Sequence, residues 1–409
     1  MKKLDGHSAM IVSKYFMSMD DFIRLECVCK KFEKTVDKFH FNPIPLTKTQ
    51  LKYFTQIETF HQYHKEDEPF SDIHFFKRII YYPTSYMYYH LTKDTNESYK
   101  FLHLMYGLSE RLFFGDEVPK NVNILGDSCF SSCYFLTSID FKSPFQRSES
   151  DKYHLTALGN SCFQKCTNLR SVILNNEIIS LGNNCFSECE MLRKIVLPTN
   201  LLFLGNNCFS NCVNISKIKC PKYIKTIPQS CFSFCNSLRE IKFFPNTTKF
   251  EENAFYECKS LERVFVSNDT VSLGDFCFFT CVALSEFNFP LNLKTIGKFC
   301  FSNCSSLSII NIPKGISRLS ECCFNSCSSL VEIVLQNDLK SVGRSCFENC
   351  VTLKGVNIPL AVTFLGDSCF NNCSNLAEVY MPKKMKYIGN YCFAECKNLS
   401  KLTFPSEVD

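Results

Sequence analysis

Residues 365–382 read LGDSCFNNCSNLAEVYMP, and variants of this stretch recur along most of the chain. A Cys-Phe pair, once replaced by Ala-Phe, marks each of twelve copies. The first residues of these pairs are Cys129, Cys162, Cys185, Cys208, Cys231, Ala254, Cys277, Cys300, Cys323, Cys346, Cys369 and Cys392. Successive pairs lie 23 residues apart, except that 33 residues separate the first two. The chain therefore consists mainly of one repeated structural unit.

Each copy divides into two halves with different apolar spacing. In the first half, Cys369, Phe370, Cys373 and Leu376 follow the spacing i, i+1, i+4, i+7, which predicts a helical or 3₁₀ turn with one inward face. The second half, as in residues 330–335, alternates and is rich in branched residues, which predicts a short strand. One copy cannot bury its own apolar face, so the copies must stack, with their strands forming a parallel sheet and their helical turns covering the other side.

Glycine and proline recur at fixed places in the unit. Proline follows the predicted strand and ends it, because proline cannot donate a ladder hydrogen bond. Glycine precedes the helical half, where we expect it to fit the turn into that half. The glycines are Gly182, Gly205, Gly274, Gly297, Gly343, Gly366 and Gly389.

The repeat resembles the BspA-like leucine-rich repeats, whose unit has Ala-Phe-x-x-Cys where this chain usually has Cys-Phe-x-x-Cys. The resemblance covers residues 122–405. It implies an α/β repeat fold: a curved leucine-rich-repeat solenoid with a parallel sheet on the concave side and short helical or 3₁₀ turns on the convex side. It also implies a binding function, and some members of the family are surface adhesins.

The chain has 27 cysteines, and most of them occupy two positions of the repeat. Their Cys-x₃-Cys spacing is compatible with zinc, but Ala254 replaces one of them and no histidine follows His154. We therefore predict that they are small buried apolar residues, with no metal and no cofactor. The second position is cysteine in every copy, so we expect its S–H group to donate a weak hydrogen bond to a loop carbonyl of the neighbouring coil. Disulfides between adjacent coils remain an alternative, which the lack of a secretory signal disfavours.

Residues 1–45 do not carry the sequence pattern of the repeats. Ser18 and Asp21 are expected to cap a helix whose apolar face runs from Phe22 through Leu25, Cys29 and Phe32 to Val36. The stretch 20–32 resembles the second half of an F-box, which implies binding to a ubiquitin-ligase adaptor. The residues that would bind that adaptor are Leu4, Phe22, Leu25, Val28 and Phe32. The alternative is a plain helical cap for the open end of the solenoid.

Three segments follow from these patterns. Residues 1–45 form the helical F-box-like or capping segment, and residues 46–121 form degenerate first coils or an N-terminal cap, with strands at 54–60 and 78–82. Residues 122–409 form the twelve-copy solenoid. A polar insertion at 142–152 is expected to be a loop sensitive to proteases.

Two rows of exposed residues are expected on the strands of the concave face. The early coils place basic residues there and the later coils place acidic ones, with Phe265 and Tyr380 as aromatic anchors. The candidate partner-binding residues are Lys194, Lys217, Lys219, Lys242, Arg263, Phe265, Glu286, Glu332, Glu378 and Tyr380. A protein-binding surface is the sharper hypothesis, because aromatic and arginine side chains dominate interfaces. A solvated polar face is the alternative.

Composition narrows the function further. A net charge of +5 is too weak to indicate nucleic acid or anionic lipid as the partner, and no stretch is apolar enough to predict a transmembrane segment. Residues 155–409 contain no histidine and no catalytic motif, so we predict no enzyme. The sequence predicts a cytoplasmic scaffold that binds an unidentified protein. A ubiquitin-ligase substrate receptor and an adhesin exported to the cell surface by an unconventional route are the alternatives. An open sheet edge at the C-terminus could also support self-association.

Overall fold

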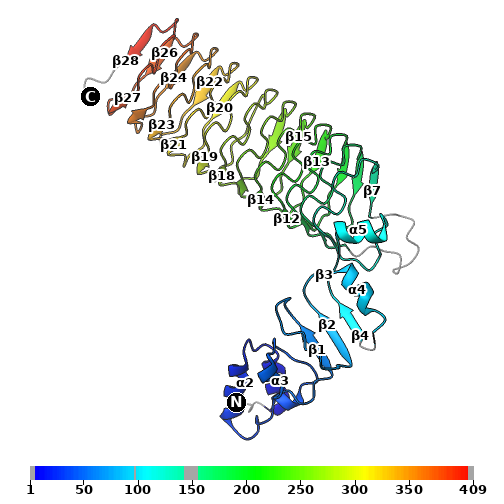
Figure 1. Ribbon diagram of the computed structural model, residues 1–409. Helices are drawn as coiled ribbons and strands as arrows, with labels where there is room; N and C mark the ends of the chain where they lie inside the picture. Colours follow the sequence, from blue (N-terminus) through cyan, green and yellow to red (C-terminus); the bar gives the residue numbers. More distant parts are fainter. Residues whose placement is uncertain (1–4, 96–97, 142–154, 404–409) are drawn as a thin grey trace. The chain divides into compact units, whose positions relative to one another are not determined.

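The computed structural model describes residues 5–95, 98–141 and 155–403. The chain divides into two compact units, Met1–Ile124 and Leu125–Asp409, here called the N-terminal unit and the solenoid unit (Figure 1). Leu4, the insertion at 142–152 and the residues after 403 lie outside the described residues, so the predictions for them stay predictions.

The N-terminal unit combines short helices with short parallel strands. Strands β1, β2 and β4 form one parallel sheet, and β3 pairs with β5. The elements are α1 (Gly6–Ser13), α2 (Met19–Val28), η1 (Val36–Lys38), α3 (Lys48–Leu51), β1 (Thr59–Gln62), β2 (Lys77–Ile80), β3 (Thr84–Ser85), α4 (Tyr86–Thr92), β4 (Ser98–Phe101), β5 (Leu104–Tyr106) and α5 (Leu108–Phe114). The strand predicted at 78–82 is found as β2, whereas the strand predicted at 54–60 begins only at Thr59 and continues to Gln62.

The second N-terminal helix is shorter than its apolar spacing predicted. The Asp21 carboxylate accepts hydrogen bonds from the Ser18 N–H at 3.1 Å and the Ser18 hydroxyl at 2.9 Å, so the predicted cap is confirmed. Helix α2 nevertheless ends at Val28, because Cys29 is fully extended. The expected continuation through Phe32 to Val36 is wrong: turns and the 3₁₀ helix η1 take its place.

Most coils of the solenoid unit carry two short parallel strands, which form two separate rows (Figure 1). The first row consists of β7 (Ser138–Asp140), β9 (Ser171–Ile173), β11 (Lys194–Val196), β13 (Lys217–Lys219), β15 (Glu240–Lys242), β17 (Arg263–Phe265), β20 (Ile309–Asn311), β22 (Glu332–Val334), β24 (Gly355–Asn357), β26 (Glu378–Tyr380) and β28 (Lys401–Thr403). The second row consists of β6 (Ile124–Leu125), β8 (Ala157–Leu158), β10 (Ser180–Leu181), β12 (Phe203–Leu204), β14 (Thr226–Ile227), β16 (Lys249–Phe250), β18 (Ser272–Leu273), β19 (Thr295–Ile296), β21 (Arg318–Leu319), β23 (Ser341–Val342), β25 (Phe364–Leu365) and β27 (Tyr387–Ile388). The parallel-strand solenoid predicted from the repeat is confirmed.

The segment that contains the two repeat cysteines is a chain of turns rather than regular helix. In each of the twelve coils the residue before each cysteine position has a positive φ, between 49° and 62°, as Ser345 and Asn349 do. A left-handed residue every fourth position prevents a continuous right-handed helix. Alternate N–H groups instead bond to the next coil: the N–H of Phe130 donates to the carbonyl of Cys162 at 2.7 Å. The turns therefore form their own ladder between coils.

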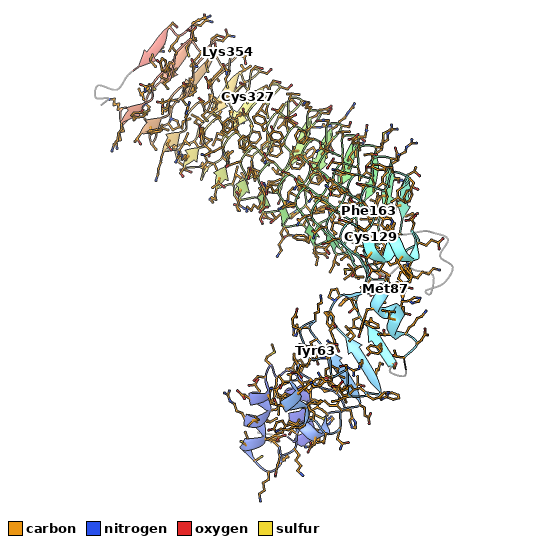
Figure 2. All side chains as sticks on the ribbon, viewed as in Figure 1. Tyr63, Met87, Cys129, Phe163, Cys327 and Lys354 are labelled. Atoms are coloured by element: carbon orange, nitrogen blue, oxygen red, sulfur yellow. The ribbon has the colours of Figure 1, made fainter. Side chains whose placement is uncertain are left out.

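A continuous stack of phenylalanine rings fills the interior. The repeat phenylalanines are buried and lie nearly parallel, with ring centroids 5.3 Å apart between Phe163 and Phe186 and 5.4 Å apart between Phe255 and Phe278. Figure 2 shows how densely side chains fill the coils around Phe163 and Cys327. Each ring stacks on the rings of neighbouring coils, so the core forms by stacking, as expected.

The repeat glycines have a different role from the one expected. At Gly205 an added Cβ would lie 2.3 Å from the backbone nitrogen of Asn183 and 2.3 Å from the carbonyl carbon of Gly182 in the preceding coil. Positive φ is found instead at the cysteine turns described above. Glycine at this position therefore permits close contact between adjacent coils, and is not needed for a turn.

Candidate functional site

The cysteines of the repeat belong to the core and not to a reactive site. The second-position thiols donate hydrogen bonds to phenylalanine carbonyls of the preceding coil: Cys166 to Phe130 at 3.0 Å, and Cys258 to Phe232 at 3.0 Å. This confirms the hydrogen bond expected from the invariant second position. Burial raises the pKa of the Cys235 thiol to about 12, which keeps it protonated and unreactive at neutral pH. All 27 cysteines are free in the structure.

The first-strand face is formed by the outward residues of the first row. Most strands in this row alternate exposed, buried, exposed, as in Lys217, Ile218 and Lys219, and the outward residues of β9 are partly exposed. All ten candidate partner-binding residues have exposed side chains. The strands pair in register, so equivalent residues form straight rows across the coils.

Some of these candidates are already engaged by neighbours. Arg263 Nη2 lies 3.0 Å from Glu240 Oε2. Lys401 Nζ donates to the Tyr380 hydroxyl at 2.8 Å and lies 4.7 Å from the centre of its ring. The Tyr380 hydroxyl in turn donates to Glu378. These contacts reduce the charge contrast between early and late coils that the sequence predicted, and they cover one of the two aromatic anchors.

Lysines dominate the early part of the face. Lys219 and Lys242 are directly opposite each other on the paired strands β13 and β15. Like charges in such cross-strand pairs repel, and the repulsion destabilises the pair. Lys194 and Lys217 occupy the equivalent first position of β11 and β13. Among the described residues, none of these four lysines has a carboxylate within salt-bridge distance.

The first row is not one continuous sheet. Strand β11 ends a sheet and β13 begins the next, although they belong to adjacent coils. At this break lie two grooves of about 670 and 510 Å³ that share Ile195, Val196, Lys219 and Phe244. The first groove contains the four lysines, and the second is mainly apolar.

A second break lies at residues 286–288, which form no strand. Phe287 and Phe289 pack edge-on there with ring centroids 4.9 Å apart, and Phe287 also lies 4.8 Å from Phe301. At the position of Phe287 the neighbouring coils carry Val264 and Ile310, and we attribute the loss of strand pairing to the larger ring. Glu286 lines the resulting groove of about 700 Å³. Glu332 pairs in register with Ile309 at its far side.

The chain was compared with known protein families and structures. Residues 117–156, 156–270, 248–377 and 305–409 match the BspA type Leucine rich repeat region (6 copies), and together they cover more than half of the chain. The chain belongs to this family.

A solved structure shows the same kind of fold. A leucine-rich repeat protein from Bacteroides ovatus ATCC 8483 is 23% identical over 72% of this chain and 85% of its own, with a TM-score of 0.50. A leucine rich cell surface protein from Faecalibacterium prausnitzii A2-165 is 21% identical over 68% of this chain and 82% of its own, with a TM-score of 0.45. No curated protein matches the chain.

One feature of this BspA-type solenoid was missed from the sequence. The second row of strands precedes the repeat glycine and exposes its first residue, and Phe364 and Tyr387 stack there with ring centroids 4.9 Å apart. The signal was present, since an outward residue alternates with an inward Leu, Ile, Val or Phe just before the glycine position. Two residues are too few to predict a strand by alternation.

The F-box-like residues are placed mainly inside the N-terminal unit. Phe22 is fully buried and Phe32 nearly so, whereas Leu25 is partly buried and Val28 is exposed. Phe22 packs edge-on against Phe39 and Phe54, with centroids 5.9 Å apart in both pairs. Phe22 therefore belongs to the hydrophobic core of this unit.

His61 of the N-terminal unit stacks on Phe41, 4.8 Å away. Burial lowers its pKa to about 4, so it is neutral at physiological pH. Within the described residues, no group of three histidine, cysteine or acidic side chains is placed to hold a metal ion. Of the described helices, none is long and apolar enough to cross a membrane.

Proposed function

We propose that the chain is a non-catalytic scaffold that binds a protein partner on its first-strand face. The observation that carries this proposal is the group of exposed lysines on three successive coils: Lys219 and Lys242 lie opposite each other on paired strands, and Lys194 and Lys217 occupy the first positions of β11 and β13. The pairing of β13 with β15 holds Lys219 and Lys242 at a fixed spacing, about 4.8 Å between strands, and so presents a preorganised charge pattern to a partner.

A charge-reversal variant tests this proposal. The triple variant Lys217→Glu, Lys219→Glu and Arg263→Glu should weaken capture of the partner from the native source and abolish its dependence on salt. The matched control reverses Lys340, Lys354 and Lys294, which are exposed on other parts of the solenoid unit. If both variants capture partners equally well, the first-strand face is not the binding site.

The two alternative functions are a ubiquitin-ligase substrate receptor and a cell-surface adhesin, and each differs from the proposed scaffold in one respect. A ubiquitin-ligase substrate receptor would need the N-terminal unit to bind an adaptor, but Phe22 and Phe32 are buried there, which favours the scaffold. An adhesin would use the same face and differ in location only. Surface labelling of intact cells tests the location, and ligase components in the captured material would favour the receptor.

A further inference from the structure

The break between β11 and β13 coincides with an unusual residue. Cys220 follows strand β13, at the position where the neighbouring coils carry Leu197 and Phe243. It is one of the few cysteines outside the two regular positions of the repeat. A cysteine side chain is smaller than leucine or phenylalanine, so it leaves space that its neighbours would fill.

That space is an apolar trough beside the lysines. Leu197, Pro198, Cys220, Pro221 and Phe244 line the smaller groove. Leu197 and Phe244 are partly exposed and Val196 is exposed, so the trough presents apolar surface to solvent. The shared lining residues make it continuous with the lysine-bearing groove.

The charges around this trough are unbalanced. Six basic side chains line the larger groove, and only Glu240 and Glu262 oppose them. Glu240 is already paired with Arg263. The opposed pair Lys219 and Lys242 adds like-charge repulsion, which a bound anionic group would relieve.

We propose that this double groove binds an extended peptide segment of a partner protein that carries both carboxylates and apolar side chains. The carboxylates pair with Lys194, Lys217, Lys219 and Lys242, and the apolar side chains enter the trough around Cys220. The inference rests on the proposed function, because it assigns the ligand class to the same face. The apolar trough favours a peptide over a nucleic acid, whose phosphates would use only the lysines.

Direct binding of synthetic peptides tests the ligand class. Fluorescent twelve-residue peptides made of Glu and Leu, of Gln and Leu, of Lys and Leu, or of Glu alone are titrated against the full chain, with a single-stranded oligonucleotide for comparison. We expect the Glu and Leu peptide to bind best, and the variant Lys219→Glu, Lys242→Glu to weaken it about tenfold or more, because two attractions become repulsions. The control variant Lys340→Glu, Lys354→Glu has the same charge change away from the groove and should leave binding unchanged (Lys354 is labelled in Figure 2).

Two further variants test the trough itself. Cys220→Leu introduces the residue found one coil earlier and should weaken the Glu and Leu peptide while leaving the weak binding of the Glu peptide unchanged. Because a larger buried residue can disturb packing, Val196→Ser provides an exposed alternative with the same expected result. Equal or tighter binding of the Glu peptide or the oligonucleotide would overturn the proposal, since the site would then recognise negative charge alone.

Selection from a random peptide library separates this inference from the proposed function. Enrichment of acidic and apolar sequences that is lost in Lys219→Glu, Lys242→Glu supports the inference. Enrichment of another composition that still depends on the first-strand face overturns the inference and leaves the proposed function standing. If no enriched peptide depends on this face, both are wrong.

Discussion

Raising the pH to about 9 should bring the solenoid unit close to its unfolding midpoint, because its core contains many buried thiols. The pKa of nineteen of these thiols is raised above the ordinary value of 9.0, by a hydrogen bond with a cysteine of the adjacent coil and by burial in Cys189 and Cys373 and mainly by burial in the others, to about 11 for Cys322 and about 12 for Cys220 and Cys235. In the folded chain these thiols stay protonated at pH 9, whereas in the unfolded chain they are about half ionised.

The sign and size of the effect follow from proton linkage. A raised pKa in the folded state means that the stabilisation is complete well below pH 9 and is lost as the pH rises above it. At pH 9 each half-ionised thiol stabilises the unfolded chain by RT ln 2, about 0.4 kcal/mol, so nineteen thiols contribute on the order of 8 kcal/mol. The whole free energy of unfolding of a domain is typically about 5–15 kcal/mol. The solenoid unit should therefore be stable at pH 7 and near its unfolding midpoint close to pH 9.

Circular dichroism and urea denaturation between pH 7 and 10, with a reducing agent present, measure this transition. The variant Cys231→Ala, Cys277→Ala, Cys323→Ala introduces the residue already found at Ala254 and removes three of the nineteen thiols. Between pH 7 and pH 9, the free energy of unfolding of this variant should fall by about one sixth less than that of the unmodified chain. An unfolding free energy that is unchanged between pH 7 and pH 9.5 would refute the reasoning, because it would mean that the buried thiols do not control alkaline stability.

Other predictions concern packing and thiol exposure. Gly205→Ala should lower the free energy of unfolding, measured by urea denaturation, by about 1–3 kcal/mol, because the added Cβ would collide with the preceding coil. The control Glu251→Ala, at the same repeat position, should change this free energy by less than about 1 kcal/mol. Phe255→Ala opens the ring stack and should cost about 3–5 kcal/mol, whereas the exposed Phe265→Ala should cost less than about 1 kcal/mol; similar losses would contradict the stacked core. In the folded chain a thiol reagent should react quickly only with Cys27, Cys29 and Cys396, and in denaturant all 27 cysteines should react; a lower count in denaturant would indicate disulfides and an oxidising compartment.

The interior of the solenoid could be predicted because every coil repeats the same constraint. Phe, Leu and the two cysteines recur at fixed spacing, and stacking is the only way to bury them. Even the hydrogen bond of the cysteine at the second repeat position could be predicted. That position is cysteine in all twelve copies, whereas a purely apolar contact would tolerate Ala there. The turn conformation could not be predicted, because Ser, Asn, Glu, Phe, Tyr, Cys, Lys and Thr all occupy the left-handed positions. The stacked ladder, not an intrinsic preference of those residues, holds them there.

The exposed face was predicted correctly at the level of single strands, since alternation sets which residues point outward. Pairing between coils was harder to predict. Coils that obey the same pattern pair at β13 and β15 but not at β11 and β13 or at β22 and β24, and alternation along a single strand does not encode this difference. The engagement of Tyr380 by Lys401 likewise depends on register across two coils.

These departures from regularity are the strongest guide to function in such a chain. Residues that keep the repeat are constrained by stacking, so they carry little information about a partner. Cys220 relaxes that constraint in one coil, and the trough beside it is next to an unpaired group of lysines. A smaller residue and a like-charge pair each lower stability on their own. Their occurrence together at one break in the ladder is explained if a bound acidic and apolar segment offsets both.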